Sequence, residues 1–134
     1  MEDMSLNRVK ISILWIFEAL IYVLYLGIVM TAPGVIDQLA TRSLSGTPVE
    51  FADLVFSLLF IVILAMAFLT LVLKGSLNRW ANVAVGAVFA VLEFLALTQL
   101  FATPFSPMIL TTILKVVVPA SISLLSYRWL KPAP

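Results

Sequence analysis

The chain has 134 residues, of which 63% are hydrophobic and 11% are charged, and its mean hydropathy is +1.15. These values exclude a soluble domain of this length and predict an integral membrane protein. Histidine and cysteine are absent, which excludes disulfide chemistry, thiolate nucleophiles, Cys/His zinc sites and His-ligated haem. The net charge of +1 identifies no partner. No cofactor, no metal site and no nucleic acid binding is expected.

Four apolar runs are long enough to cross a bilayer, which takes about 20 helical residues per span. The runs cover residues 11–31, 54–73, 81–103 and 108–130. They predict an all-α, polytopic membrane protein, an antiparallel bundle of four transmembrane helices forming a single domain over residues 1–134. Gly75 is expected to end the second helix, and the Ser76 hydroxyl can cap the third.

The longest connection between spans is residues 32–53. Apolar residues between Val35 and Ala40 can line one side of a short helix at the membrane interface, with Asp37 and Arg42 facing water. Such a helix is a candidate lid over the bundle. A solvated connection with a single interfacial turn is the favoured interpretation, because loops of that kind are common.

Positive charges are distributed unevenly between the two sides of the predicted bundle. Six of them fall on one side, and Arg42 alone falls on the other. The six are Arg8, Lys10, Lys74, Arg79, Arg128 and Lys131. By the positive-inside rule, the protein is a multi-pass protein of the plasma or inner membrane with both termini in the cytoplasm. The first span contains Glu18 and lacks a small-residue cleavage pattern, so it is expected to stay in the mature protein.

Three ionisable residues, Glu18, Glu93 and Lys115, lie inside the apolar runs. A bare charge in hydrocarbon costs about 2.5 kcal/mol or more, so each needs a partner, a proton or water. At about 1.5 Å per residue, Glu93 lies about 21 Å from Arg79 and Lys115 about 20 Å from Arg128 along their helices. The matching depths predict a Glu93–Lys115 ion pair, which leaves Glu18 as a surplus acid.

In the first span, Trp15, Glu18, Tyr22 and Tyr25 share one helical face, because they are spaced at i, i+3, i+7 and i+10. Tyrosine hydroxyls on this face can donate to a carboxylate. Two interpretations stay open: the stripe lines a polar cavity, or Glu18 is neutral and joins helices by hydrogen bonds. On the first interpretation the ligand-binding or proton-binding residues are Glu18, Tyr22, Tyr25, Glu93 and Lys115.

The third and fourth spans each carry a face that can meet the other. On the third span this face contains Asn82, Gly86, Phe89 and Glu93. On the fourth it is a polar stripe of Thr111, Thr112, Lys115, Pro119 and Ser123. Pro119 cannot donate to the carbonyl of Lys115, so a kink beside the buried cation is expected. We assign structural roles to Pro119 and Trp15.

The stretch Asn78-Arg79-Trp80-Ala81-Asn82, followed by a small-residue helix and by Tyr127-Arg128-Trp129, resembles an uncharacterised family of small prokaryotic four-helix integral membrane proteins. Members begin with a stretch similar to Leu14 to Phe17. The resemblance implies the fold and a membrane location but carries no assigned activity. Members often have an aspartate after tyrosines in the first span, where this chain has only the earlier Glu18. Arg79 and Trp80 also form a routine interfacial anchor, a structural role.

The sequence leaves three functions open. The leading function is the binding of a small molecule or cation, and this function extends to its transport. Glu18 is the proton or cation acceptor, and Lys115 is the counter-ion. Transport would need a homodimer, and small multidrug exporters resemble this chain in size and in a first-helix glutamate, although their other motifs are missing. The alternative is a non-catalytic structural or accessory membrane subunit that packs through small residues such as Gly27 and Gly86. A membrane enzyme acting on a lipid-soluble substrate is the weakest, because no nucleophile is evident.

Overall fold

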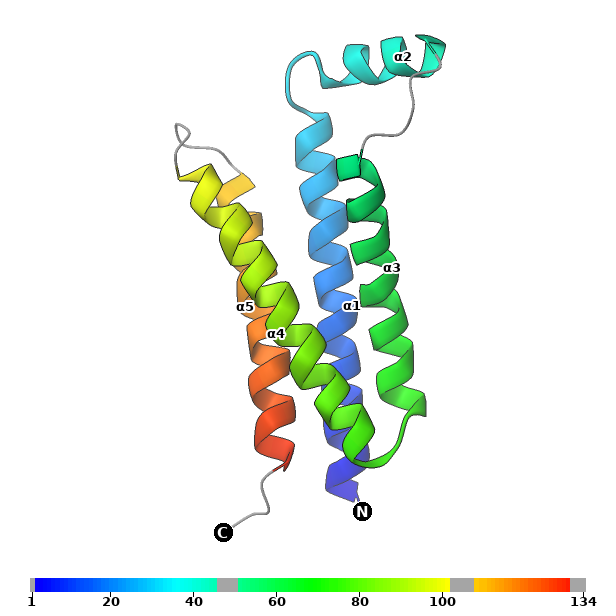
Figure 1. Ribbon diagram of the computed structural model, residues 1–134, viewed down its shortest axis with the longest axis vertical. Helices are drawn as coiled ribbons and strands as arrows, with labels where there is room; N and C mark the ends of the chain where they lie inside the picture. The colour runs from blue at the N-terminus through cyan, green and yellow to red at the C-terminus, as the bar shows by residue number, and fades with distance from the viewer. Residues whose placement is uncertain (1, 46–50, 102–107, 131–134) are drawn as a thin grey trace.

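The computed structural model describes residues 2–45, 51–101 and 108–130, and these parts of the chain form five helices without any strand (Figure 1). The helices are α1 (Glu2–Met30), α2 (Val35–Ser45), α3 (Phe51–Val72), α4 (Gly75–Leu100) and α5 (Met108–Leu130). The predicted all-α class is confirmed.

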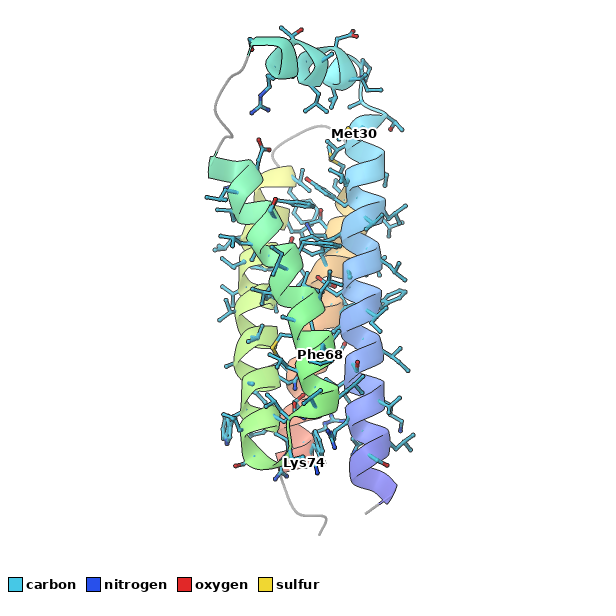
Figure 2. The ribbon with its side chains drawn as sticks, turned by 90° about the vertical axis from the view of Figure 1, so that its right-hand side faces the viewer. Met30, Phe68 and Lys74 are labelled. Carbon is cyan, nitrogen blue, oxygen red and sulfur yellow. The ribbon has the colours of Figure 1, made fainter. Side chains whose placement is uncertain are left out.

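The four long helices lie alongside one another, and α2 crosses one end of the molecule. The chain runs up α1, down α3, up α4 and down α5 (Figure 1). The α1 helix packs against both α3 and α5, and α4 packs mainly on α5, whereas α3 and α4 share few contacts. Figure 2 shows α2 beyond Met30, with Lys74 at the opposite end. The start of α1, the α3–α4 turn and the end of α5 therefore lie at one common end.

The turn between α3 and α4 is made by Lys74 and Gly75. Lys74 is extended, and Gly75 has a φ of +75°, a left-handed conformation that glycine adopts at little cost. The predicted Ser76 cap is wrong, because α4 begins at Gly75 and Ser76 already lies in its first turn. The cap position belongs to Lys74, which makes no capping bond through its side chain.

Within the described parts of the chain, four helical segments are long and apolar enough to cross a membrane. They are Ser5–Met30, Asp53–Val72, Gly75–Leu100 and Met108–Trp129. Their outward faces carry exposed side chains such as Ile13, Leu20 and Phe68, whereas Glu18, Asn82 and Lys115 are buried. Apolar residues outside and polar residues inside reverse the pattern of a soluble protein, which supports a multi-pass membrane protein.

The faces expected to meet between the third and fourth spans are in contact. A Cβ atom at Gly86 would lie 2.8 Å from the carbonyl oxygen of Pro119 and 3.1 Å from the backbone nitrogen of Ser123. The Ser123 hydroxyl donates to the carbonyl of Val83 at 3.0 Å. Glycine thus allows α4 and α5 to approach closely at the level of Pro119.

The connection over residues 32–53 contains the 11-residue helix α2. The favoured interpretation of a single interfacial turn is therefore wrong, and the alternative of a short helix is confirmed. Arg42 forms an ion pair with Asp53 of α3 at 3.2 Å. Residues 46–50 lie outside the described parts of the chain, and the lid role of α2 stays a prediction.

Candidate functional site

Lys115 of α5 lies at the centre of a buried cluster. Its ammonium nitrogen Nζ is 3.0 Å from Oε2 of Glu93 on α4, and the two side chains are only 7% and 6% exposed. The same nitrogen is 4.3 Å from the ring centroids of both Tyr22 and Tyr25 on α1. The predicted ion pair is confirmed, and two aromatic faces add a cation–π environment that the sequence did not predict.

Tyr22 completes the surroundings of Glu93. Its hydroxyl group donates to Oε1 of Glu93, so each oxygen of that carboxylate has a partner. The ring of Tyr22 also lies 5.5 Å from that of Phe56 on α3. The Lys115 cluster, defined as Lys115, Glu93, Tyr22 and Tyr25, therefore joins α1, α4 and α5 and touches α3. All of its charges are paired.

Glu18 lies one helical turn from Tyr22 on the same face of α1 and is fully buried. Neither oxygen of its carboxyl group has a hydrogen-bond partner among the described residues. A buried polar group without a partner costs roughly 1–3 kcal/mol, and a bare carboxylate costs more. Of the three ionisable side chains in the apolar spans, Glu18 is thus the one whose bonding capacity is unused.

A second set of buried polar residues lies on the side of Glu18 opposite to Tyr22. We call it the Asn82 network, and its members are Trp15, Thr70, Asn78 and Asn82. The Trp15 indole nitrogen donates to Oδ1 of Asn82 at 2.6 Å, and the Thr70 hydroxyl donates to the same oxygen at 3.0 Å. The Asn82 amide nitrogen donates to the backbone and side-chain oxygens of Asn78, each at 2.8 Å. Trp15 is therefore an internal hydrogen-bonding residue, consistent with the structural role assigned to it.

The Asn82 network also satisfies the end of α3. The amide nitrogen of Asn78 donates to the carbonyls of Thr70 and Leu73, both at 2.9 Å, and Nε of Arg8 donates to the Thr70 carbonyl at 3.2 Å. Terminal carbonyls lack intrahelical partners, so these bonds fix the end of α3. The sequence reasoning missed this role. The spacing of Asn78 and Asn82, four residues apart on the face that continues to Gly86, was the available signal.

Arg79, predicted to anchor the chain at the interface, holds α4 to the end of α5. Its guanidinium donates to the carbonyl of Trp129 at 3.1 Å and lies 5.5 Å from the centroid of that ring. Trp80 is exposed beside it. The stretch Asn78-Arg79-Trp80-Ala81-Asn82 therefore forms the start of α4, with both asparagines buried and the tryptophan facing outward.

An apolar hollow of about 140 Å³ reaches the Lys115 cluster from the side of the molecule. It lies between α1 and α3 and is lined by Tyr22, Val23, Leu26, Phe56 and Phe60. Tyr22 is thus shared between this hollow and the buried charges. A lipid-soluble molecule or an acyl chain fits the chemistry of this lining.

Comparison with known protein families, curated proteins and solved structures finds no match for this chain. The resemblance through the Asn-Arg-Trp-Ala-Asn stretch stays a prediction. The chemistry of the site therefore rests on its own geometry, which combines a neutralised ion pair with one unpartnered carboxyl group. Among the described residues, no group of three or more metal-binding side chains comes together.

Proposed function

We propose that this protein spans the plasma or inner membrane as an antiparallel bundle of α1, α3, α4 and α5, with both termini in the cytoplasm. The apolar outward faces support insertion. Among the described residues, every lysine and arginine except Arg42 and the buried Lys115 belongs to the end that holds the start of α1, the α3–α4 turn and the end of α5 (Figure 1). The exposed Ile36 and the polar Asp37 suit α2 to the opposite membrane surface.

The function that we propose is proton binding at Glu18, with transport of a small molecule or cation as the process it serves. This proposal rests on the fully buried carboxyl group of Glu18, whose two oxygens have no hydrogen-bond partner among the described residues. A proton makes such a group neutral and removes the main cost of burying it. Lys115 and Glu93 balance one another, so the site can gain and lose one proton without disturbing their pair.

A proton suits Glu18 better than a metal cation does. Hard cations such as Ca²⁺ take about six to eight oxygen ligands, and Mg²⁺ keeps several waters. The Glu93 oxygens are already engaged by Lys115 and by Tyr22. The positive charge of Lys115 also opposes a second cation in the same cluster. An organic amine is the remaining candidate, because its neutral base form can enter through the apolar hollow beside Tyr22 without opposition from the charge of Lys115.

Transport places a further demand on the architecture. Four helices enclose a narrow space, and the described hollow at Tyr22 is lined by α1 and α3 alone. A path through the membrane would therefore need a second copy of the chain, and we propose a homodimer as the transporting form.

Infrared spectroscopy of the purified protein tests proton binding directly. A protonated carboxyl group gives its own C=O stretching band, which is lost on deprotonation. We expect wild type to show a titrating band that Glu18→Gln lacks. Asp37→Asn, which removes an exposed carboxyl group, should leave the band unchanged. Identical spectra for wild type and Glu18→Gln across pH would refute a proton site at Glu18.

Thermal stability in detergent, measured against a panel of small cations and lipophilic amines, tests the ligand. A compound that raises the melting temperature of wild type but not of Glu18→Gln would locate its site at Glu18 and justify flux assays in liposomes. An equal shift in both proteins would place that compound elsewhere.

A structural or accessory subunit is the second candidate. The full set of partners in the Lys115 cluster favours it, because paired polar groups of this kind hold helices together. Gly27 adds an exposed position on α1 with no atom within 4 Å of an added Cβ, so another helix can approach there. If the protein is such a subunit, we expect Glu18→Gln to retain every property of wild type except the infrared band of the Glu18 carboxyl group.

A further inference from the structure

A hollow of about 260 Å³ lies between α1 and α5 at the basic end of the molecule, away from Glu18. Its lining comes from both helices: Asn7, Lys10, Ile11, Leu125, Arg128 and Trp129. Neither Lys10 nor Arg128 makes an ion pair or hydrogen bond with another described residue. Two unpaired cations and an amide donor therefore face one cavity, a donor set that suits a phosphate group.

A second hollow of about 250 Å³ adjoins the first along α5. It is lined by Ser121, Leu124, Leu125 and Arg128, and it shares Leu125 and Arg128 with its neighbour. Positions 121, 124, 125 and 128 have the i, i+3, i+4, i+7 spacing of one helical face. Leu124 and Leu125 are largely exposed. A groove with apolar side chains thus leads from the cationic hollow toward the middle of α5.

Trp129 is held in place beside this site. Arg79 donates to its carbonyl and stacks on its ring, so the indole is fixed at the end of α5. Tryptophan side chains favour the headgroup level of a bilayer, where one part is apolar and the other is wet. The tryptophan marks the depth at which a lipid phosphate lies in a membrane that contains this protein.

We propose that the two hollows together bind an anionic phospholipid, with its phosphate between Lys10 and Arg128 and an acyl chain along Leu124 and Leu125. This inference rests on the proposed membrane insertion but not on any role of Glu18. Charge complementarity selects the headgroup, because a net negative lipid neutralises the cations better than a zwitterionic one. The cationic hollow is smaller than the 300–1,000 Å³ typical of sites that enclose a whole drug-sized ligand. It therefore holds a headgroup and leaves the chain in the groove.

Lipid binding to the full chain in detergent, followed by native mass spectrometry, tests the proposal. The probes are phosphatidylglycerol and phosphatidylcholine with identical acyl chains. Wild type is expected to bind phosphatidylglycerol about tenfold more tightly. Lys10→Gln and Arg128→Gln should each weaken that binding about fivefold, since one basic residue near a membrane surface is worth about 1 kcal/mol. Lys74→Gln removes another exposed charge at the same end and should change the affinity for phosphatidylglycerol less than twofold.

Three results would overturn the proposal. Equal affinity of wild type for the two lipids would remove the anionic preference. An equal loss in Lys74→Gln would show diffuse attraction to a basic surface in place of a site. Displacement of the lipid by glycerol phosphate at equal concentration would show that the hollow binds free phosphate and that the groove adds nothing. None of these results alters the infrared test at Glu18, so the two proposals fail separately.

Discussion

Replacing Lys115 with methionine removes the cation of the buried cluster while keeping an unbranched side chain of similar length. The change leaves Glu93 without its partner at 3.0 Å and leaves the rings of Tyr22 and Tyr25 without the ammonium 4.3 Å from each centroid. Only the hydroxyl of Tyr22 still donates to the Glu93 carboxylate. Lys115→Met therefore tests how much of the bundle's stability depends on this one charge.

The expected loss follows from what each partner retains. Removing one partner of a buried ion pair costs about 3–5 kcal/mol, and Lys115→Met should lie near 3 because the Tyr22 bond to Glu93 remains. Glu93→Gln should cost less, about 2 kcal/mol, because a desolvated cation over an aromatic face retains up to about 2 kcal/mol. The double variant carries neither charge, so no unpaired charge stays buried. Its loss should be about 3 kcal/mol, so the coupling energy is about 2 kcal/mol.

The assay is reversible unfolding in mixed micelles, in which the free energy of unfolding is measured for wild type, both single variants and the double variant. The matched control is the exposed pair of Arg42 and Asp53, whose atoms lie 3.2 Å apart with side chains 35% and 55% exposed. A cycle with Arg42→Gln and Asp53→Asn should give a coupling below about 1 kcal/mol. If the losses from Lys115→Met and Glu93→Gln add within about 0.5 kcal/mol, the reasoning is refuted.

The same measurement checks two further expectations. Gly86→Ala should destabilise the protein by about 1–3 kcal/mol, because its new methyl group would meet backbone atoms of α5; Gly27→Ala, with open space around it, should be neutral or stabilising by up to about 1 kcal/mol. Tyr22→Phe should lose about 1–3 kcal/mol, because it removes a buried donor to the Glu93 carboxylate. Tyr25→Phe keeps the ring beside Lys115 and removes no hydrogen bond within the described chain, so equal losses in both tyrosine variants would contradict this account.

The ion pair was predictable because depth in a membrane helix follows from residue counting. Glu93 and Lys115 lie on regular helices that both begin or end at the basic end of the molecule, so a rise of about 1.5 Å per residue places them at one level. Composition likewise predicted the helical class, since long apolar runs have few other solutions in a bilayer. The ends of the helices were harder to predict from the sequence. An apolar run marks the part suited to hydrocarbon, whereas α1 begins at Glu2 and α4 at Gly75.

Lateral order was not predictable from the sequence. Residue counting gives the depth of Glu18 but not which helices flank α1, and the structure places α1 between α3 and α5. That order brings Tyr22 to Glu93 and leaves Glu18 without a bond, although the two residues share one helical face. The Asn82 network was missed for a related reason: Asn78 lies outside the apolar run 81–103, and its bonds to the carbonyls of Thr70 and Leu73 depend on how the end of α3 lies against α4.

The position of Glu18 is itself an argument for function. On one side the Asn82 network gives every polar group of Trp15, Asn82 and Asn78 a partner, and on the other side Tyr22 and Lys115 share Glu93. These two layers thus satisfy their own buried polar groups. Among the described side chains, the other buried polar atom without a partner is the hydroxyl oxygen of Ser126, a neutral group that costs less to bury than a carboxylate. An unpartnered buried group is uncommon and calls for a reason. Leucine would fill the same place without that cost, so a carboxyl group between two satisfied layers supports the proton site that we propose at Glu18.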